Sequence, residues 1–397
     1  MSVAAPIAPV AITAHTLVCA AGVGREALSQ ALFDGRSALT RSDVLEAGTW
    51  WGRVQELVAL PNEWLAWDSR ATRLALRGLQ ADGFDAAVAA AVSRHGAARV
   101  GLALGTSAST IAVSEAAYAR GCFEAPQDHE ALNTLHGVTH FVQQRLGLQG
   151  PALTVSTACS SSAKVFAVAE RWLRLQLVDA VVVAGVDALS DSLLYGFNAL
   201  GLLSAAPCRP FAAERSGINL GEAAGFALLQ RVEAAPHAPR LVGWGEANDA
   251  HHMSSPHPQG LGAERALTDA LARAGVTAHE IGYVNLHGTA SARNDEVEAA
   301  LVGRHFAAPT HASATKGVAG HTMGAAGIVE SIVCLHAPAH GHCPGTAHTE
   351  AADAALPAAF HAVFHTAASR KDVPLAANFS FGFGGNNSVL IFDKGAP

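Results

Sequence analysis

Residues 179–186 are the segment that most constrains the fold, a near-continuous run of alanine, valine and glycine after one aspartate. Such a run is typical of a parallel strand, because helices cover both faces of a parallel sheet. Similar strands are predicted at residues 99–106 and 153–157, and helical spacing lies around them at residues 115–120, 136–146 and 160–175. The alternation of strand and helix predicts a layered α/β fold.

A second half begins near Pro239, so we expect two domains, residues 1–238 and residues 239–397. In the second half, strands are predicted at residues 241–248, 281–286, 376–380 and 388–392, and helices at residues 264–274 and 323–335. No repeat of fixed period is visible, so any duplication of the two halves must be structural.

The composition of the chain indicates which kinds of partner and location to expect. Of the 397 residues, 50% are hydrophobic and 15% charged, which favours a broad subunit interface over a free monomer. A net charge of −7 without a long basic run argues against a nucleic-acid partner. Residues 10–13 already look like a first strand, and no apolar stretch has membrane-spanning length. We therefore expect a cytoplasmic protein with reduced cysteines.

Cys159 is the candidate nucleophile. It stands between a predicted strand and a predicted helix that opens with three serines and an alanine. The free N–H groups of a helix start favour a thiolate, so we expect the helix end to activate this thiol without a neighbouring base. Cysteine is more often an inert core residue. That interpretation is kept for Cys19, Cys122, Cys208, Cys334 and Cys343.

His287 and His321 each stand beside a glycine in a predicted loop. A nucleophilic cysteine together with two such histidines suggests acyl transfer through a thioester. Neither histidine is spaced as a partner of the cysteine, so we expect both to act on the second substrate. Lys316, if buried, would pair with a carboxylate and keep the imidazole of His321 neutral. The candidate carboxylates are Asp295, Glu298 and Glu330.

Two other patterns, a histidine cluster and a glycine-rich run, point less clearly to a function. Residues 251–257 include three histidines, but their spacing matches no common metal site, so no metal site is predicted. The glycine-rich run at residues 381–385 lacks the lysine and the long helix of a P-loop. A phosphate-binding loop and a hinge remain alternative interpretations of this run. A turn whose backbone N–H groups face a substrate oxygen is the better interpretation of its glycines.

A set of motifs runs in order along nearly the whole chain, at residues 35–37, 105–106, 156–161, 208–211, 221–222, 253–258, 287–289, 320–321, 324–327 and 382–387. Together they resemble the β-ketoacyl-[acyl-carrier-protein] synthases, the elongating Cys-His-His kind within the thiolase superfamily. The resemblance implies a duplicated five-layered α/β/α/β/α fold. It also implies a homodimer or heterodimer that condenses acyl groups with malonyl-[acyl-carrier-protein] in fatty-acid, polyketide or polyene synthesis. The partner would be acyl carrier protein, with no cofactor beyond its phosphopantetheine.

The resemblance also assigns roles to residues. Cys159 would accept the acyl group, and the backbone N–H groups of Cys159 and Phe383 would hold the oxyanion. His287 and His321 would promote decarboxylation in a pocket that Lys316 organises. Further implied roles are supporting carboxylates (Asp295, Glu298 and Glu330), phosphopantetheine contacts (Thr289 and Ser291) and the walls of an acyl pocket gated by Phe383 (Ser107, Ala108 and Phe197).

Two alternatives stay open. A non-catalytic chain-length-factor subunit would usually lack the nucleophile that Cys159 supplies. A thiolase-like CoA acyltransferase would need a second cysteine near Gly384. Departures from the family pattern leave the substrate and the docking mode open; they are Gly201, Ala212, Ser216, Ala290, Ala292, Asn294 and Asn386. For an acidic carrier protein, a basic helix face formed by Arg70, Arg73 and Arg77 is a candidate docking site, and a solvated face or an interface helix is the alternative interpretation.

Overall fold

The computed structural model describes residues 4–55, 57–121 and 131–395; Cys122 lies outside these ranges. A large central sheet follows the order β12-β11-β15-β16-β10-β1-β9-β7-β5-β6, with β2 (Gly22–Val23) paired to β1. Its strands are β1 (Val10–Cys19), β5 (Val100–Gly105), β6 (Ala152–Val155), β7 (Ala180–Asp187), β9 (Ala223–Arg231), β10 (Arg240–Asn248), β11 (Tyr283–Leu286), β12 (His311–Ala314), β15 (Leu375–Gly382) and β16 (Asn386–Asp393).

The two halves of this sheet have the same strand order and pairing. The first half runs β6-β5-β7-β9-β1, and the second runs β12-β11-β15-β16-β10. In each half the first three strands are parallel, the fourth pairs antiparallel with the third, and the fifth pairs antiparallel with the fourth. The halves join where β1 pairs with β10. A chain without a visible sequence repeat therefore folds as a structural duplicate.

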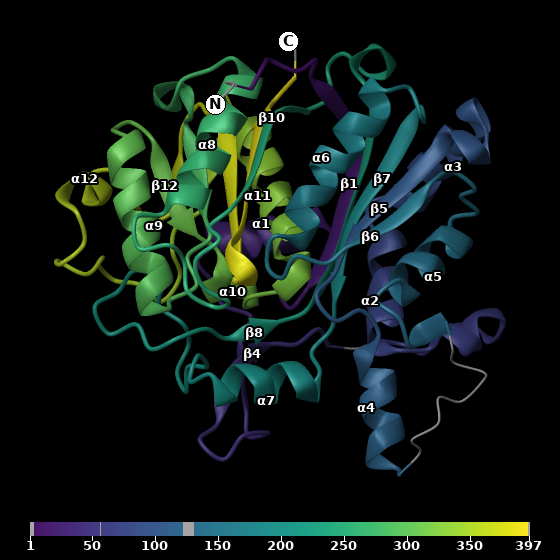
Figure 1. The fold of residues 1–397 in the computed structure, drawn as a ribbon, viewed down its shortest axis with the longest axis horizontal. Helices are drawn as coiled ribbons and strands as arrows, with labels where there is room; N and C mark the ends of the chain where they lie inside the picture. The colour runs from purple at the N-terminus through teal and green to yellow at the C-terminus, as the bar shows by residue number, and fades with distance from the viewer. Residues whose placement is uncertain (1–3, 56, 122–130, 396–397) are drawn as a thin grey trace.

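Helices cover both halves and produce five layers (Figure 1). α6 (Ser161–Arg174) and α11 (Ala326–His340) lie between the two halves of the sheet and share one apolar core with both. The outer layer of the first half contains α2 (Arg70–Leu79), α3 (Phe84–His95) and α5 (Gly137–Arg145). The outer layer of the second half contains α8 (Leu261–Ala274), α9 (Ala292–His305) and α12 (Ala358–His361). The predicted five-layered α/β fold is confirmed.

Shorter elements complete the chain. The helices are α1 (Arg25–Phe33), α4 (Ile111–Ala119), α7 (Asp191–Ala199) and α10 (Lys316–Ala319), and the minor strands are β3 (Thr40–Ser42), β4 (Thr49–Gly52), β8 (Leu220–Gly221), β13 (His342–Cys343) and β14 (Ser369–Arg370). Within the described ranges, no helix combines the length and the apolar character needed to cross a membrane.

The elements predicted from sequence correspond closely to the observed ones. β7 is buried along its whole length, as its apolar run indicates. The helix predicted at residues 323–335 begins only at Ala326 and continues to His340. It begins late because Met323 has a left-handed φ of 55°, which an α-helix does not tolerate. β9 was not predicted, although it is central to the first half of the sheet.

Gly105 provides a test of the packing that supports this fold. A Cβ atom at Gly105 would lie 2.3 Å from the backbone nitrogen of Ser162, at the start of α6. We expect Gly105→Ala to lower the free energy of unfolding by about 1–3 kcal/mol, since overpacking forces backbone shifts. The control is Gly196→Ala in α7, where no atom lies within 4 Å of the added Cβ. This control should be neutral or stabilising in urea denaturation, and equal losses in both variants would contradict the packing argument.

Candidate active site

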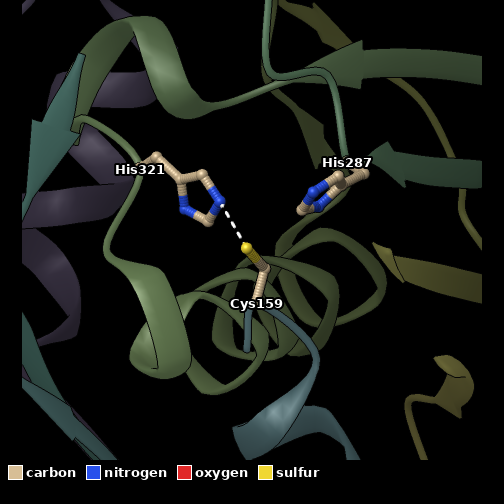
Figure 2. A group of neighbouring side chains, drawn as sticks. All are labelled: Cys159, His287 and His321. Carbon is tan, nitrogen blue, oxygen red and sulfur yellow. Dashed lines mark hydrogen bonds between the residues drawn. The ribbon is translucent and has the colours of Figure 1, made fainter. Parts of the chain in front are cut away.

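Three loops bring Cys159, His287 and His321 together (Figure 2). Cys159 lies between β6 and α6, and His287 directly follows β11. His321 lies between α10 and α11, in a loop that follows β12. Because β6 and β12 are equivalent strands of the duplicated sheet, the nucleophile loop and the His321 loop occupy equivalent places in the two halves. All three side chains are buried.

His321 contacts the thiol directly, with Nε2 3.0 Å from Sγ of Cys159. The prediction from sequence that neither histidine is spaced to pair with Cys159 is therefore wrong, because the fold brings together residues that are 162 positions apart. The backbone N–H of Met323 donates to Nδ1 of His321 over 3.1 Å. A neutral imidazole that accepts at Nδ1 carries its proton on Nε2. His321 therefore faces the sulfur as a hydrogen-bond donor, and it does not face it as a base.

The thiol of Cys159 is not activated in the way that the sequence suggested. Burial raises the pKa of this thiol to about 11, although the positive charge of Lys316 and the N–H of Phe383 both act to lower it. The expected thiolate is thus wrong for the resting site. Desolvation of the fully buried anion is the largest cause of this shift.

His287 is held by Lys316. The Lys316 Nζ lies 3.5 Å from Nδ1 of His287 and also donates to the backbone carbonyl of that histidine. An ammonium group only donates hydrogen bonds, so Nδ1 is the acceptor and Nε2 carries the proton. Burial, followed by the charge of Lys316, holds the pKa of His287 and His321 well below the usual range. Both imidazoles are therefore neutral, with N–H groups at Nε2.

Lys316 is paired with Glu330 of α11, and both side chains are only 3% exposed. Burial raises the pKa of Glu330 to about 7 against the opposing effect of Lys316. Of the three carboxylates named from sequence, Glu330 is thus the one that contacts the lysine. The ion pair connects α10, the loop after β11 and α11 at one point.

Glu298 and Asp295 support the loops from α9. The carboxylate of Glu298 accepts the backbone N–H groups of His287 and Gly288 over 2.6 and 2.8 Å. Asp295 accepts the N–H of Phe211 over 2.7 Å. Burial raises the pKa of Glu298 to about 8 and that of Asp295 to about 6. Both act on backbone groups and therefore fix the position of His287 and its surroundings.

The three central side chains also have the spacing of a metal site. One ligand atom from each of Cys159, His287 and His321 lies within 4.8 Å of the others, and this is the one such group among the described residues. A metal requires the lone pair of a ring nitrogen. Here the Nδ1 atoms accept hydrogen bonds and the Nε2 atoms carry protons, so the inward-facing nitrogens suit a substrate oxygen better than a cation.

A cavity of about 500 Å³ opens onto these side chains. Thr289 and Ser291 lie on its wall, with their hydroxyl oxygens 2.9 Å apart. The rings of Phe197 and Phe383 pack with their centres 5.7 Å apart on the same wall. Ser107 and Ala108, expected from sequence in an acyl pocket, are not among the described residues that line this cavity.

Two further residues of the site were missed from sequence. Phe381 lines the cavity with its ring centre 5.9 Å from that of His287. Arg215 also lines it, is only 6% exposed and forms ion pairs with Asp353 and Glu296. No motif marked Arg215, whereas Phe381 begins the glycine-rich run and could have been found there.

The basic helix face expected on α2 is largely absent. Arg70 forms an ion pair with the fully buried Glu222, and Arg73 forms one with Asp68. Only Arg77 is exposed. The three arginines do have helical spacing on α2. Two of them are nevertheless paired with acidic residues that the sequence did not point to: Glu222 is far from Arg70 in the sequence, and Asp68 belongs to no recognised motif.

Comparison with known proteins shows the family to which this chain belongs. The N-terminal domain model of β-ketoacyl synthases matches residues 92–235, and the C-terminal domain model matches residues 239–350. A 3-oxoacyl-[acyl-carrier-protein] synthase 2 of Vibrio cholerae is 31% identical over 323 residues, which are 76% of this chain and 78% of the relative. The chain belongs to the β-ketoacyl synthase family.

Solved structures of the family are also similar. A chain from the complex of a ketosynthase with its chain length factor from Xenorhabdus doucetiae is 35% identical, with a TM-score of 0.90 over 97% of this chain and 98% of that chain. A chain of the ishigamide ketosynthase/chain length factor is 25% identical, with a TM-score of 0.86 over 98% of this chain and 99% of that chain. The resemblance to β-ketoacyl synthases inferred from the sequence is confirmed.

The charge of Lys316 should set the acid limit of activity. Because burial and Lys316 lower the pKa of His287, the neutral imidazole persists in weakly acidic solution. Lys316→Met removes that charge, so the pKa should rise and carbon dioxide release from malonyl-carrier protein should decline at a higher pH than in the wild type. The double variant Lys316→Met/Glu330→Gln is the control, since it also removes the buried carboxylate left without its cation. An acid limit unchanged in both variants would show that Lys316 does not tune the imidazole.

Proposed function

We propose that this chain is a catalytic ketosynthase that condenses an acyl group on Cys159 with malonyl-[acyl-carrier-protein]. The observation that carries the proposal is a buried thiol with two imidazoles beside it at one cavity: Nε2 of His321 lies 3.0 Å from the sulfur, and a ring nitrogen of His287 lies within 4.8 Å of it. Two N–H donors beside a nucleophile suit a reaction in which negative charge develops on a carbonyl oxygen. The substrates are carried as phosphopantetheine thioesters, and Thr289 and Ser291 on the cavity wall would contact that arm.

In the first step, the sulfur of Cys159 attacks the acyl thioester of the carrier. The backbone N–H groups of Cys159 and Phe383 lie at the sulfur and are the donors for the resulting oxyanion. The carbon–sulfur bond to phosphopantetheine then breaks, and the proton from Cys159 passes to the departing sulfur. Hydrogen bonding from His321 stabilises the sulfur of Cys159 as it gives up this proton and becomes the attacking anion.

In the second step, malonyl thioester takes the place of the released arm. Its carboxylate leaves as carbon dioxide, and the electron pair of the broken carbon–carbon bond moves to the thioester oxygen as an enolate. His287 and His321 donate hydrogen bonds to that oxygen. The enolate carbon attacks the acyl carbon on Cys159, and the sulfur of Cys159 leaves as a thiolate when the new carbon–carbon bond has formed. This thiolate takes up a proton from solvent and returns to the resting thiol.

The proposed division at residues 238 and 239 places the nucleophile in the first half and both histidines in the second. The similar structures contain a ketosynthase together with a chain length factor. Because Cys159 and both histidines are present, we assign this chain to the ketosynthase role and infer a ketosynthase-like partner or a second copy. A chain-length-factor role and a thiolase-like CoA activity are the competing assignments.

Mass spectrometry of the intact protein separates these assignments. The protein is incubated with acyl-carrier protein or with acyl-CoA, and malonyl-carrier protein is then added. A ketosynthase should gain one acyl group on Cys159 from the carrier and release it as a β-ketoacyl product. A chain that stays unmodified would instead be a chain length factor, and one that condenses only CoA thioesters would be thiolase-like.

Substitution of the nucleophile should abolish condensation. Cys159→Ala removes the thiol while filling a site of similar size, so circular dichroism should be unchanged. Cys159→Gln should also block acylation but leave malonyl decarboxylation running, because its amide resembles the acyl-enzyme carbonyl. Full turnover by Cys159→Ala would exclude a thioester mechanism on this residue.

The histidines should matter more for decarboxylation than for acyl uptake. Removal of one oxyanion donor typically costs about 100- to 1000-fold in rate. We therefore expect His287→Ala and His321→Ala to become acylated at Cys159 yet release carbon dioxide more slowly by a factor in that range. Trapped acyl-enzyme and released gas are measured separately. Decarboxylation at the wild-type rate in either variant would remove that histidine from the proposed mechanism.

Ser107 and Ala108 should limit the length of the acyl chain, with Phe197 as a second wall. Both small residues lie in the turn after β5. Ala108→Phe should shorten the longest accepted chain and spare the shortest primer, since extra bulk in a packed tunnel costs about 1–3 kcal/mol. Competition between acyl-carrier proteins of several lengths is the measurement. An unchanged length profile would place the pocket elsewhere.

A further inference from the structure

Asp187, the last residue of β7, is a buried carboxylate that the proposed mechanism does not use. Its side chain is fully buried, and no ion pair to it exists among the described residues. Instead it accepts hydrogen bonds from the Thr106 hydroxyl and from the backbone N–H groups of Ser107, Ala108 and Gly324, at 2.7, 2.7, 3.1 and 2.6 Å. Four donors occupy the carboxylate, so no acceptor position is left for solvent.

These contacts join two loops of the site. Thr106, Ser107 and Ala108 form the turn after β5, whereas Gly324 follows the His321 loop. The approach is close, because a Cβ atom on Gly324 would lie 2.5 Å from Oδ2 of Asp187 and 2.5 Å from the nitrogen of Ser107. Glycine at this position is therefore required by the contact with Asp187.

Met323 lies between Gly324 and the catalytic loop and is the strained residue of the segment. Its φ of 55° is left-handed, which costs about 1–3 kcal/mol for a residue with a side chain and persists only where the surroundings impose it. From this conformation the N–H of Met323 donates to Nδ1 of His321. That single bond is the one that keeps the imidazole proton on Nε2, facing Cys159.

We infer that Asp187 is a positioning residue for His321. By holding the N–H of Gly324, it keeps Met323 left-handed, and Met323 in turn selects the Nε2–H form of the imidazole. The same carboxylate holds the turn at Ser107 and Ala108, so the proposed acyl pocket and the histidine donor share one anchor. The catalytic part of this inference rests on the proposed function, whereas the choice of tautomer does not.

The test is Asp187→Asn in the full chain, with the imidazole nitrogens labelled with 15N and observed by NMR without substrate. The wild type should show His321 as the Nε2–H tautomer, and the variant should show a mixture with Nδ1–H. Decarboxylation of malonyl-carrier protein should fall by about 100-fold in kcat with little change in KM, as expected for a small displacement of a reacting group. Acylation of Cys159 should persist. A variant that keeps the pure Nε2–H tautomer would overturn the inference, whatever its activity.

Three further variants keep the test decisive. Thr106→Val removes one bond to Asp187 but leaves the bond from Gly324, so the tautomer should be unchanged. Gly324→Ala should displace the carboxylate and reproduce the mixed tautomer, which covers the case in which Asp187→Asn does not fold. Met323→Gly removes the backbone strain, so Asp187→Asn should cost less kcat in this background, as a double-mutant cycle measures. Equal losses in both backgrounds would show that Asp187 does not act through Met323.

Discussion

The buried ion pair between Lys316 and Glu330 is the interaction on which the geometry of this site depends. Removing two charges from water costs several kcal/mol per ion, and the cost is offset only where further hydrogen bonds complete the pair. Here the remaining donors of the lysine reach the carbonyl and Nδ1 of His287. The lysine therefore orients one imidazole and, together with burial, lowers the pKa of both. The ion pair also joins α10 to α11.

The duplicated sheet explains why the site has paired supports. The loop after β5 is held by the carboxylate of Asp187, and the equivalent loop after β11 is held by the carboxylate of Glu298. In both places a buried acid accepts consecutive backbone N–H groups. Each half thus uses a buried carboxylate to stabilise the turn at the end of a parallel strand. The two halves differ in what the neighbouring loops present, a thiol in one half and an imidazole in the other.

The sequence allowed most of the fold and the central residues of the site to be predicted, because both leave local signals. The apolar run of β7 and the run of small residues after Cys159 each extend over a few consecutive positions, so both can be recognised in the sequence. The contact of His321 with Cys159 could not be read in this way, since it joins residues from the two halves. The raised pKa of the thiol was missed for a related reason, because burial, the largest cause of the shift, results from the packing of segments that are distant in the sequence. Arg70 was misjudged because Glu222, which neutralises it, lies 152 positions away.

The ring nitrogen that carries the proton in each of the two imidazoles distinguishes this site from a metal-binding site. Cysteine and histidine are both zinc ligands, and the three side chains lie close enough together to hold a metal ion. Only the hydrogen bonds at Nδ1 from Lys316 and Met323 prevent the inward nitrogens from offering lone pairs. Replacing Lys316 with a hydrogen-bond acceptor would move the proton of His287 to its outer nitrogen. The scaffold is therefore a starting point for designing a metalloenzyme, in which the change would be made behind the histidines and not in the ligands themselves.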